Sequence, residues 1–131
     1  MIGLDTNVLV RYIMQDDAKQ SPKANRLIES LSADNPGFIS IVSVIELFWV
    51  LTSCYQLSHV QVTQALETML RTKSFVIERP GQVARALSMF KGGKTDLADC
   101  LIHFSAVDAG CTDTMTFDVS AAKHAGMTLV Q

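Results

Sequence analysis

Residues 1–10, MIGLDTNVLV, decide how the chain is interpreted, because a carboxylate interrupts a run that is otherwise apolar. Met1 to Leu4 have the composition of a short buried strand, and apolar residues resume at Val8. Asp5 therefore stands where a strand passes into a helix, with Asn7 as a candidate cap for that helix. Charged side chains are seldom placed against a protein core unless they are paired or bind a metal. The stretch predicts a strand, a helix and a functional carboxylate between them.

Strand and helix patterns alternate along the rest of the chain. Short apolar runs rich in β-branched residues predict strands over residues 1–5, 38–42, 74–78, 114–117 and 127–130. Amphipathic stretches predict helices over residues 7–14, 21–33, 43–55, 58–71, 81–90, 95–109 and 119–125. We expect four of these helices to be capped by Ser21, Ser43, Ser58 and Thr95. The alternation predicts an α/β fold in which helices cover both faces of a parallel sheet.

Length and composition predict a single domain. The chain has 131 residues, of which 48% are hydrophobic, and this is enough for one domain spanning residues 1–131. No run approaches the roughly 20 apolar residues that cross a bilayer. Asp5 and Asn7 interrupt the only candidate for a secretory signal, so we expect a soluble, cytoplasmic protein. Cys54, Cys100 and Cys111 lack C-x-x-C spacing, which predicts neither disulfides nor a zinc site.

Several carboxylates are expected at one edge of the sheet. In open parallel sheets, ligands bind beyond the carboxyl ends of the strands. Asp5 and Asp118 each follow a predicted strand directly, and Glu46 lies one turn into the helix after the second strand. Asp96 and Asp99 lie in the first turn of the helix that follows the loop at residues 91–94. Their spacing of three places them on the same side of that helix. The sequence therefore predicts that these five acids converge.

Each of these acids also has a purely structural interpretation. Glu46 completes the pattern Ser43-x-x-Glu46, a capping box in which the glutamate bonds back to the cap residue. Asp96 is favourable at a helix N-terminus through the helix dipole, and Asp118 is a candidate cap for the short helix that follows it. Asp5 and Asp99 are harder to explain in this way, because each precedes a strongly apolar run. The predicted cluster disappears only if all of these structural interpretations hold together.

Convergent carboxylates repel one another, and a hard divalent cation is the usual compensation. Mg²⁺ and Mn²⁺ prefer oxygen ligands, which suits a site made of Asp and Glu and fits zinc or copper poorly. Such an ion can activate a water molecule and stabilise a leaving oxygen, which indicates phosphoryl transfer or hydrolysis. Setting aside Asp5, Glu46, Asp99 and Asp118 changes the formal net charge from −2 to +2. The basic residues nearest the acids in sequence are candidate contacts to a phosphate backbone, or ordinary solvated charges: Arg11, Lys91 and Lys94.

Four motifs stand in the order, and at about the spacing, of the acidic motifs of one protein family. They are MIGLDTNVLV (1–10), SVIELFWVL (43–51), TDLADCLIHFSAVDAG (95–110) and MTFD (115–118). In these motifs the chain resembles PIN-domain proteins, and in particular the VapC family of toxin ribonucleases. The resemblance spans nearly the whole chain. It implies a three-layer α/β/α sandwich with a central parallel sheet of about five strands.

The resemblance also implies a site and a reaction. Carried over residue by residue, it makes Asp5, Glu46, Asp99 and Asp118 the catalytic acids and the ligands of Mg²⁺ or Mn²⁺, with Asp96 as an accessory ligand. The polar residues beside these acids are supporting candidates: Thr6, Asn7, Ser43 and Thr116. The implied activity is that of an endoribonuclease that hydrolyses RNA phosphodiester bonds, with transfer RNA and ribosomal RNA among the family's targets.

The partners implied by the resemblance are those of a type II toxin–antitoxin system. Proteins of this kind form homodimers and larger assemblies with a VapB-type antitoxin, and they meet operator DNA only through that antitoxin. The helix from Ser43 is apolar nearly all the way round, which makes Phe48 and Trp49 candidates for an interface. The alternative is a central helix that is buried on most sides.

Two other classes of function remain open from the sequence. An Mg²⁺-dependent phosphohydrolase with an aspartate nucleophile also begins with a strand that ends in Asp, but it needs D-x-D, and Asn7 stands where the second acid belongs. A catalytically silent PIN-like RNA-binding module is the non-enzymatic alternative. His103 follows Asp99 by four residues, so it is a candidate for a metal or acid–base role, or an ordinary half-buried histidine.

Overall fold

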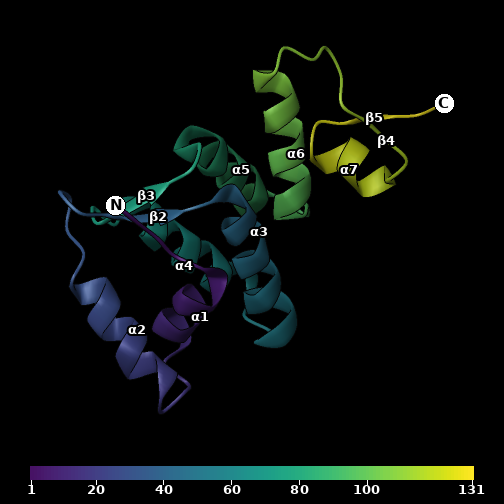
Figure 1. Ribbon diagram of the computed structural model, residues 1–131. Helices are drawn as coiled ribbons and strands as arrows, with labels where there is room; N and C mark the ends of the chain where they lie inside the picture. Colours follow the sequence, from purple (N-terminus) through teal and green to yellow (C-terminus); the bar gives the residue numbers. More distant parts are fainter. The chain divides into compact units, whose positions relative to one another are not determined.

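Strands and helices alternate along residues 1–131, all of which the computed structural model describes (Figure 1). The chain divides into two compact units, Met1–Pro80 and Gly81–Gln131. The first unit contains β1 (Ile2–Gly3), α1 (Thr6–Met14), α2 (Gln20–Glu29), β2 (Gly37–Ile39), α3 (Ile41–Trp49), the π-helical turn η1 (Val50–Cys54), α4 (His59–Arg71) and β3 (Phe75–Ile77). The second contains α5 (Pro80–Gly92), α6 (Leu97–Asp108), β4 (Met115–Thr116), α7 (Val119–His124) and β5 (Thr128–Leu129).

The sheet of the first unit is parallel, with the strand order β1-β2-β3. Gly37 at the start of β2 pairs with Ile2 on one side and Phe75 on the other. A Cβ atom at Gly37 would lie 2.6 Å from Leu4 Cδ1, so a larger residue there would force the Leu4 side chain to shift. The parallel order brings the carboxyl ends of the three strands to one edge, where α1 and α3 begin.

Local side chains start the helices of the first unit. Asp5 caps α1, and the Ser40 side chain accepts from the Ser43 N–H at the start of α3. Ser58 and Gln61 form a complete capping box at α4, which confirms the predicted cap. The predicted caps at Ser21 and Ser43 are wrong, because α2 already begins at Gln20 and α3 at Ile41.

The core of the first unit lies largely along one face of α3. Val44, Leu47 and Leu51 are fully buried, and Phe48 is only 5% exposed. Trp49, by contrast, is 48% exposed, and Val42 is more exposed still. The helix therefore has one core face and one exposed apolar side. Of the two predicted interface residues, Phe48 therefore packs in the core, whereas Trp49 is accessible at the surface.

The second unit is built around a two-stranded parallel sheet. Met115 pairs with Thr128 and Thr116 with Leu129. Gly110 ends α6 at φ +90°, as its position after the predicted helix requires, because L residues rarely adopt that conformation. Gly126 has φ +77°, and a Cβ there would lie 2.8 Å from His103 Nε2. His103 therefore packs against this turn at the end of α7.

We predicted a single sheet of about five strands. The structure instead contains a three-stranded sheet and a two-stranded sheet. The strands are also shorter than predicted, since each spans two or three residues. Apolar composition identified where the strands lie, but only backbone pairing sets their ends. No helix has the length and apolar character needed to cross a membrane.

Candidate functional site

Asp5 and Glu46 meet around one buried threonine. Asp5 Oδ1 accepts from the Thr6 N–H at 2.8 Å and so caps α1. The Thr6 hydroxyl donates to Glu46 Oε1 at 2.9 Å. Thr6 is only 6% exposed, whereas both acids lie at the surface. The hydroxyl therefore holds the start of α1 against the middle of α3, with one carboxylate on each side and open to solvent.

Glu46 does not form the predicted capping box. Its carboxylate accepts from Thr6. The N-terminus of α3 is satisfied by other groups, since Ser40 Oγ accepts from the Ser43 N–H at 3.1 Å and Glu78 Oε1 from the Ile41 N–H at 2.9 Å. Ser43 is buried, and its hydroxyl accepts from Ser40 Oγ. Ser43 thus supports the beginning of the helix that carries Glu46.

The second unit places carboxylates at the starts of two helices. Asp96 caps α6, since its Oδ1 accepts from the N–H groups of Ala98 (2.6 Å) and Asp99 (3.3 Å). The predicted cap, Thr95, is instead buried beside Cys100. Asp118 caps α7 through the N–H groups of Ser120 (2.8 Å) and Ala121 (3.2 Å). Asp96 and Asp118 therefore do cap helices, as their structural interpretation predicted. Each cap uses only Oδ1, so the second carboxylate oxygen makes no cap contact.

Asp99 is the acid that the cap contacts do not explain. It lies half-buried in the first turn of α6. Burial raises the pKa of Asp99, and the nearby negative charges of Asp96 and Asp118 raise it further. Three carboxylates of the second unit therefore act on one another electrostatically. The Thr116 hydroxyl accepts from the Asp118 N–H at 3.0 Å and so supports the backbone at Asp118.

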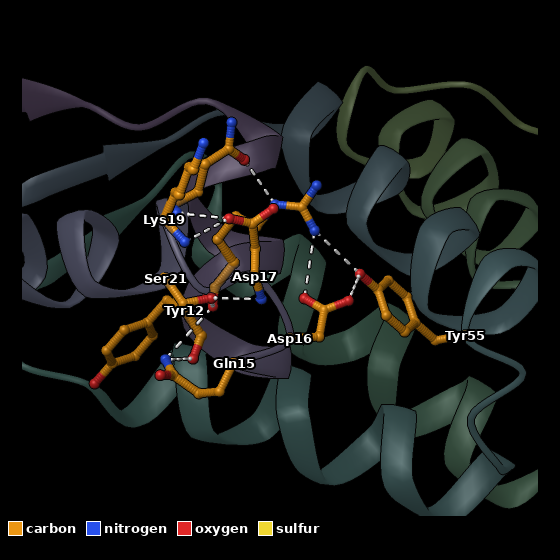
Figure 2. A network of polar contacts seen from close by, with 9 residues as sticks. Tyr12, Gln15, Asp16, Asp17, Lys19, Ser21 and Tyr55 are labelled. Atoms are coloured by element: carbon orange, nitrogen blue, oxygen red, sulfur yellow. Dashed lines mark hydrogen bonds and ion pairs between the residues drawn. The ribbon is translucent and has the colours of Figure 1, made fainter.

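Arg11, in the last turn of α1, belongs to a polar network that includes Asp16 and Tyr55, both labelled in Figure 2. Its Nε donates to Gln20 Oε1 at 2.8 Å, and its Nη1 lies 3.3 Å from Asp16 Oδ1 and 3.4 Å from the Tyr55 hydroxyl. The Tyr55 hydroxyl in turn donates to Asp16 Oδ2 at 2.7 Å, a contact that lowers the pKa of Asp16. The sequence analysis did not identify Asp16 and Tyr55, because residues so far apart in the chain leave no local pattern that predicts their contact.

The remaining predicted site residues take less specific positions. Asn7 is exposed in the first turn of α1, and Lys94 is exposed between α5 and α6. Lys91 lies in the last turn of α5, so the predicted loop at residues 91–94 is shorter than expected. His103 Nδ1 lies 3.5 Å from the Thr114 hydroxyl, and its ring packs on Phe104, which favours a structural role. Neither unit by itself brings together three His, Cys, Asp or Glu side chains in a group that would hold a metal ion.

The predicted acids thus form two sets, each attached to strand ends and helix starts. One comprises Asp5 and Glu46, and the other Asp96, Asp99 and Asp118. A scan against family models matches residues 2–127 to the PIN domain. The chain belongs to the PIN domain family. No match was found among curated proteins.

Membership of the PIN family indicates a coarse function for the chain. The PIN domain is an α/β fold and generally a nuclease fold, and its members are commonly metal-dependent. The match covers every predicted acid, from Asp5 to Asp118. Family membership therefore favours a hydrolase that cuts nucleic acid over a phosphohydrolase with an aspartate nucleophile.

Proposed function

We propose that this PIN-domain protein is a metal-dependent endoribonuclease toxin of the VapC kind, which acts in the cytoplasm and is inhibited by a cognate antitoxin. The observation that carries the proposal is the Thr6–Glu46 hydrogen bond, 2.9 Å long, in a chain that matches the PIN family. The Thr6 hydroxyl holds the Glu46 carboxylate in one position, as a functional site requires of its supporting hydrogen bonds. Asp5, the residue before Thr6, is held at the same place.

The chemistry of the acids fits Mg²⁺ or Mn²⁺. All of the candidate ligands offer carboxylate oxygens, the donors that these ions prefer. Asp5, Glu46 and Asp118 are exposed, and Asp99 is half-buried beside other carboxylates whose charges a cation would offset. We therefore assign Asp5, Glu46, Asp99 and Asp118 as ligands, with Asp96 as an accessory. When bound, such an ion supplies an activated water and a positive charge at the leaving oxygen.

The protein's own contribution is to fix these oxygens in place. Thr6 and Ser43 hold the acids of the first unit, since one donates to Glu46 and the other supports the start of α3. In the second unit, the helix N–H groups orient one oxygen each of Asp96 and Asp118 and leave the other available. Ligands held in this way lose little conformational entropy when they bind a charged group.

The proposed ligands are tested by metal-directed cleavage of the protein backbone. Fe²⁺ that replaces Mg²⁺ generates hydroxyl radicals in the presence of ascorbate and cuts the backbone near its ligands. We expect cuts near residues 5 and 46 and also near residues 99 and 118. The absence of cuts near the residues of one set would remove that set from the proposed ligands.

The activity is tested by incubating total cellular RNA with purified protein and Mg²⁺ or Mn²⁺, against EDTA. We expect metal-dependent cleavage that Asp5→Asn and Glu46→Gln abolish. Glu29→Gln is the matched control, because Glu29 is an exposed glutamate at the end of α2 and takes no part in the site. Mapping the new RNA ends would then show whether transfer RNA or ribosomal RNA is cut.

Two results would count against the nuclease proposal. One is a folded, antitoxin-free protein that cuts no RNA with either metal, which would favour a silent RNA-binding module. The other is cleavage that survives in both acid variants, which would indicate a contaminating nuclease.

The proposal also includes a homodimer and a larger assembly with a VapB-type antitoxin, through which alone operator DNA would be bound. Trp49 supports a docking surface, because the residue is 48% exposed and its ring meets that of Phe48 in an edge-to-face contact, with ring centroids 5.8 Å apart. We expect Trp49→Arg to weaken self-association in sedimentation experiments while circular dichroism stays unchanged. An unaltered dimerisation constant would remove Trp49 from the interface.

A further inference from the structure

A recess of about 270 Å³ lies between α1 and α2 in the first unit. Its walls are apolar and are formed by Val8, Ala24 and Leu27. Polar and charged side chains lie around it, among them Asn7, Arg11 and Lys23. The recess therefore combines an apolar surface, against which a flat apolar group can pack, with side chains that can donate hydrogen bonds to an anion.

The recess is adjacent to the proposed catalytic acids. Asn7 lines it and is only two residues from Asp5, while Arg11, which also lines it, is six residues away on the same helix. At 1.5 Å per residue, the recess extends from about 3 to 9 Å along α1 from Asp5. That range is comparable with the step between neighbouring nucleotides, which is about 3.4 Å when bases stack and longer when they splay apart.

Arg11 is held rigidly at the recess. Gln20, Asp16 and Tyr55 engage its Nε and Nη1 atoms, and no residue accepts from Nη2. Its charge is partly offset by Asp16. The network thus fixes a guanidinium whose remaining N–H groups can donate without further loss of side-chain entropy.

Lys23 supplies the charge that is not offset. It is exposed on α2, lines the recess and forms no ion pair. A lysine in this position is a point charge suited to a phosphate, while the walls beside it suit a base. Charge complementarity therefore favours a nucleic acid strand over an apolar peptide as the occupant.

We propose that this recess binds one nucleotide of the RNA substrate next to the cut, with its base against Val8, Ala24 and Leu27 and its phosphate at Lys23 and Arg11. The inference rests on the proposed ribonuclease function and extends it, since it assigns a binding subsite outside the acidic residues. It makes Lys23 and Ala24 determinants of RNA binding.

The charge contact is tested by equilibrium binding of a fluorescent uridine oligomer to the Asp5→Asn protein, which binds without cutting. Adding Lys23→Gln should weaken binding about fivefold at low salt. It should also reduce the slope of log K against log salt by about 0.7, the value for one phosphate contact on a single strand. Arg26→Gln is the matched control, because it removes the same charge from α2 outside the recess.

The base contact is tested by filling the recess. Ala24→Leu should weaken binding of the uridine oligomer about fivefold, but should leave binding of an abasic ribose phosphate oligomer unchanged. Ala65→Leu is the control, because Ala65 lines a second recess of about 350 Å³ between α1 and α4. Circular dichroism checks that both variants fold.

The nucleotide subsite and the nuclease function can be refuted independently. If the wild-type protein cuts RNA but Lys23→Gln and Ala24→Leu bind the uridine oligomer as tightly as their control variants do, the subsite is refuted. The recess would then be a candidate site for a protein segment. If the wild-type protein cuts nothing but binding depends on Lys23 and Ala24 as described, the subsite stands and the nuclease function fails.

Discussion

Replacing Thr6 by Val isolates the contact that joins Asp5 to Glu46. Valine keeps the β-branched shape of the buried side chain and removes only the hydroxyl that donates to Glu46 at 2.9 Å. The Asp5 cap on α1 is a contact to the Thr6 backbone N–H, so it survives the substitution. The variant therefore frees Glu46 while the helix start stays intact.

The expected cost in stability is small. A hydrogen bond of this kind contributes about 0.5–1.5 kcal/mol, and the exposed Glu46 carboxylate regains water when the hydroxyl is lost. We expect the free energy of unfolding to fall by about 1 kcal/mol, which lowers Tm by roughly 3–5 °C in a domain of this size. The effect on catalysis should be larger, because a misplacement of about 1 Å at a reacting centre can reduce the rate roughly 100-fold.

The assay compares urea unfolding with initial rates of RNA cleavage at a temperature where every variant is folded. Thr63→Val is the control, because Thr63 is equally buried but its hydroxyl donates to the His59 carbonyl within α4. We expect a loss in kcat/KM of about 10- to 100-fold for Thr6→Val alone. Cleavage at the wild-type rate, or a loss that Thr63→Val shares, would refute the assigned role of Thr6.

Two further predictions follow from single contacts. The Tyr55 hydroxyl lowers the pKa of Asp16 from 3.8, so the carboxylate stabilises the fold above about pH 4 and this contribution disappears as the pH falls through the lowered pKa. Asp16→Asn should therefore lower stability to urea at pH 7 but not at pH 2, and an equal loss at both would contradict this. Gly126→Ala should lower the free energy of unfolding by about 1–2 kcal/mol, because φ is +77° and the new Cβ meets His103. Adding His103→Ala should relieve only the clash, so full recovery of the melting temperature would argue against backbone strain.

Much of the fold was predictable because it depends on neighbours in sequence. The Ser58 capping box, the end of α6 at Gly110 and the alternation of strands with helices all follow from residues a few positions apart. Predicted caps were wrong where a polar residue close by in the sequence took the role, as Ser40 does at α3 and Asp96 at α6. At α3, Glu78 reaches Ile41 from another strand end, and no pattern around Ser43 could reveal it.

The candidate site divides in the same way. The sequence by itself determined which acids stand at strand ends and helix starts, because local backbone geometry places the carboxylates of Asp5, Asp96 and Asp118 there. Only the tertiary structure decided that Glu46 bonds to Thr6, 40 positions away, and that Arg11 meets Tyr55, 44 positions away. Local conformational preferences act over a few residues, whereas contacts at these separations exist only after packing has brought two helices together.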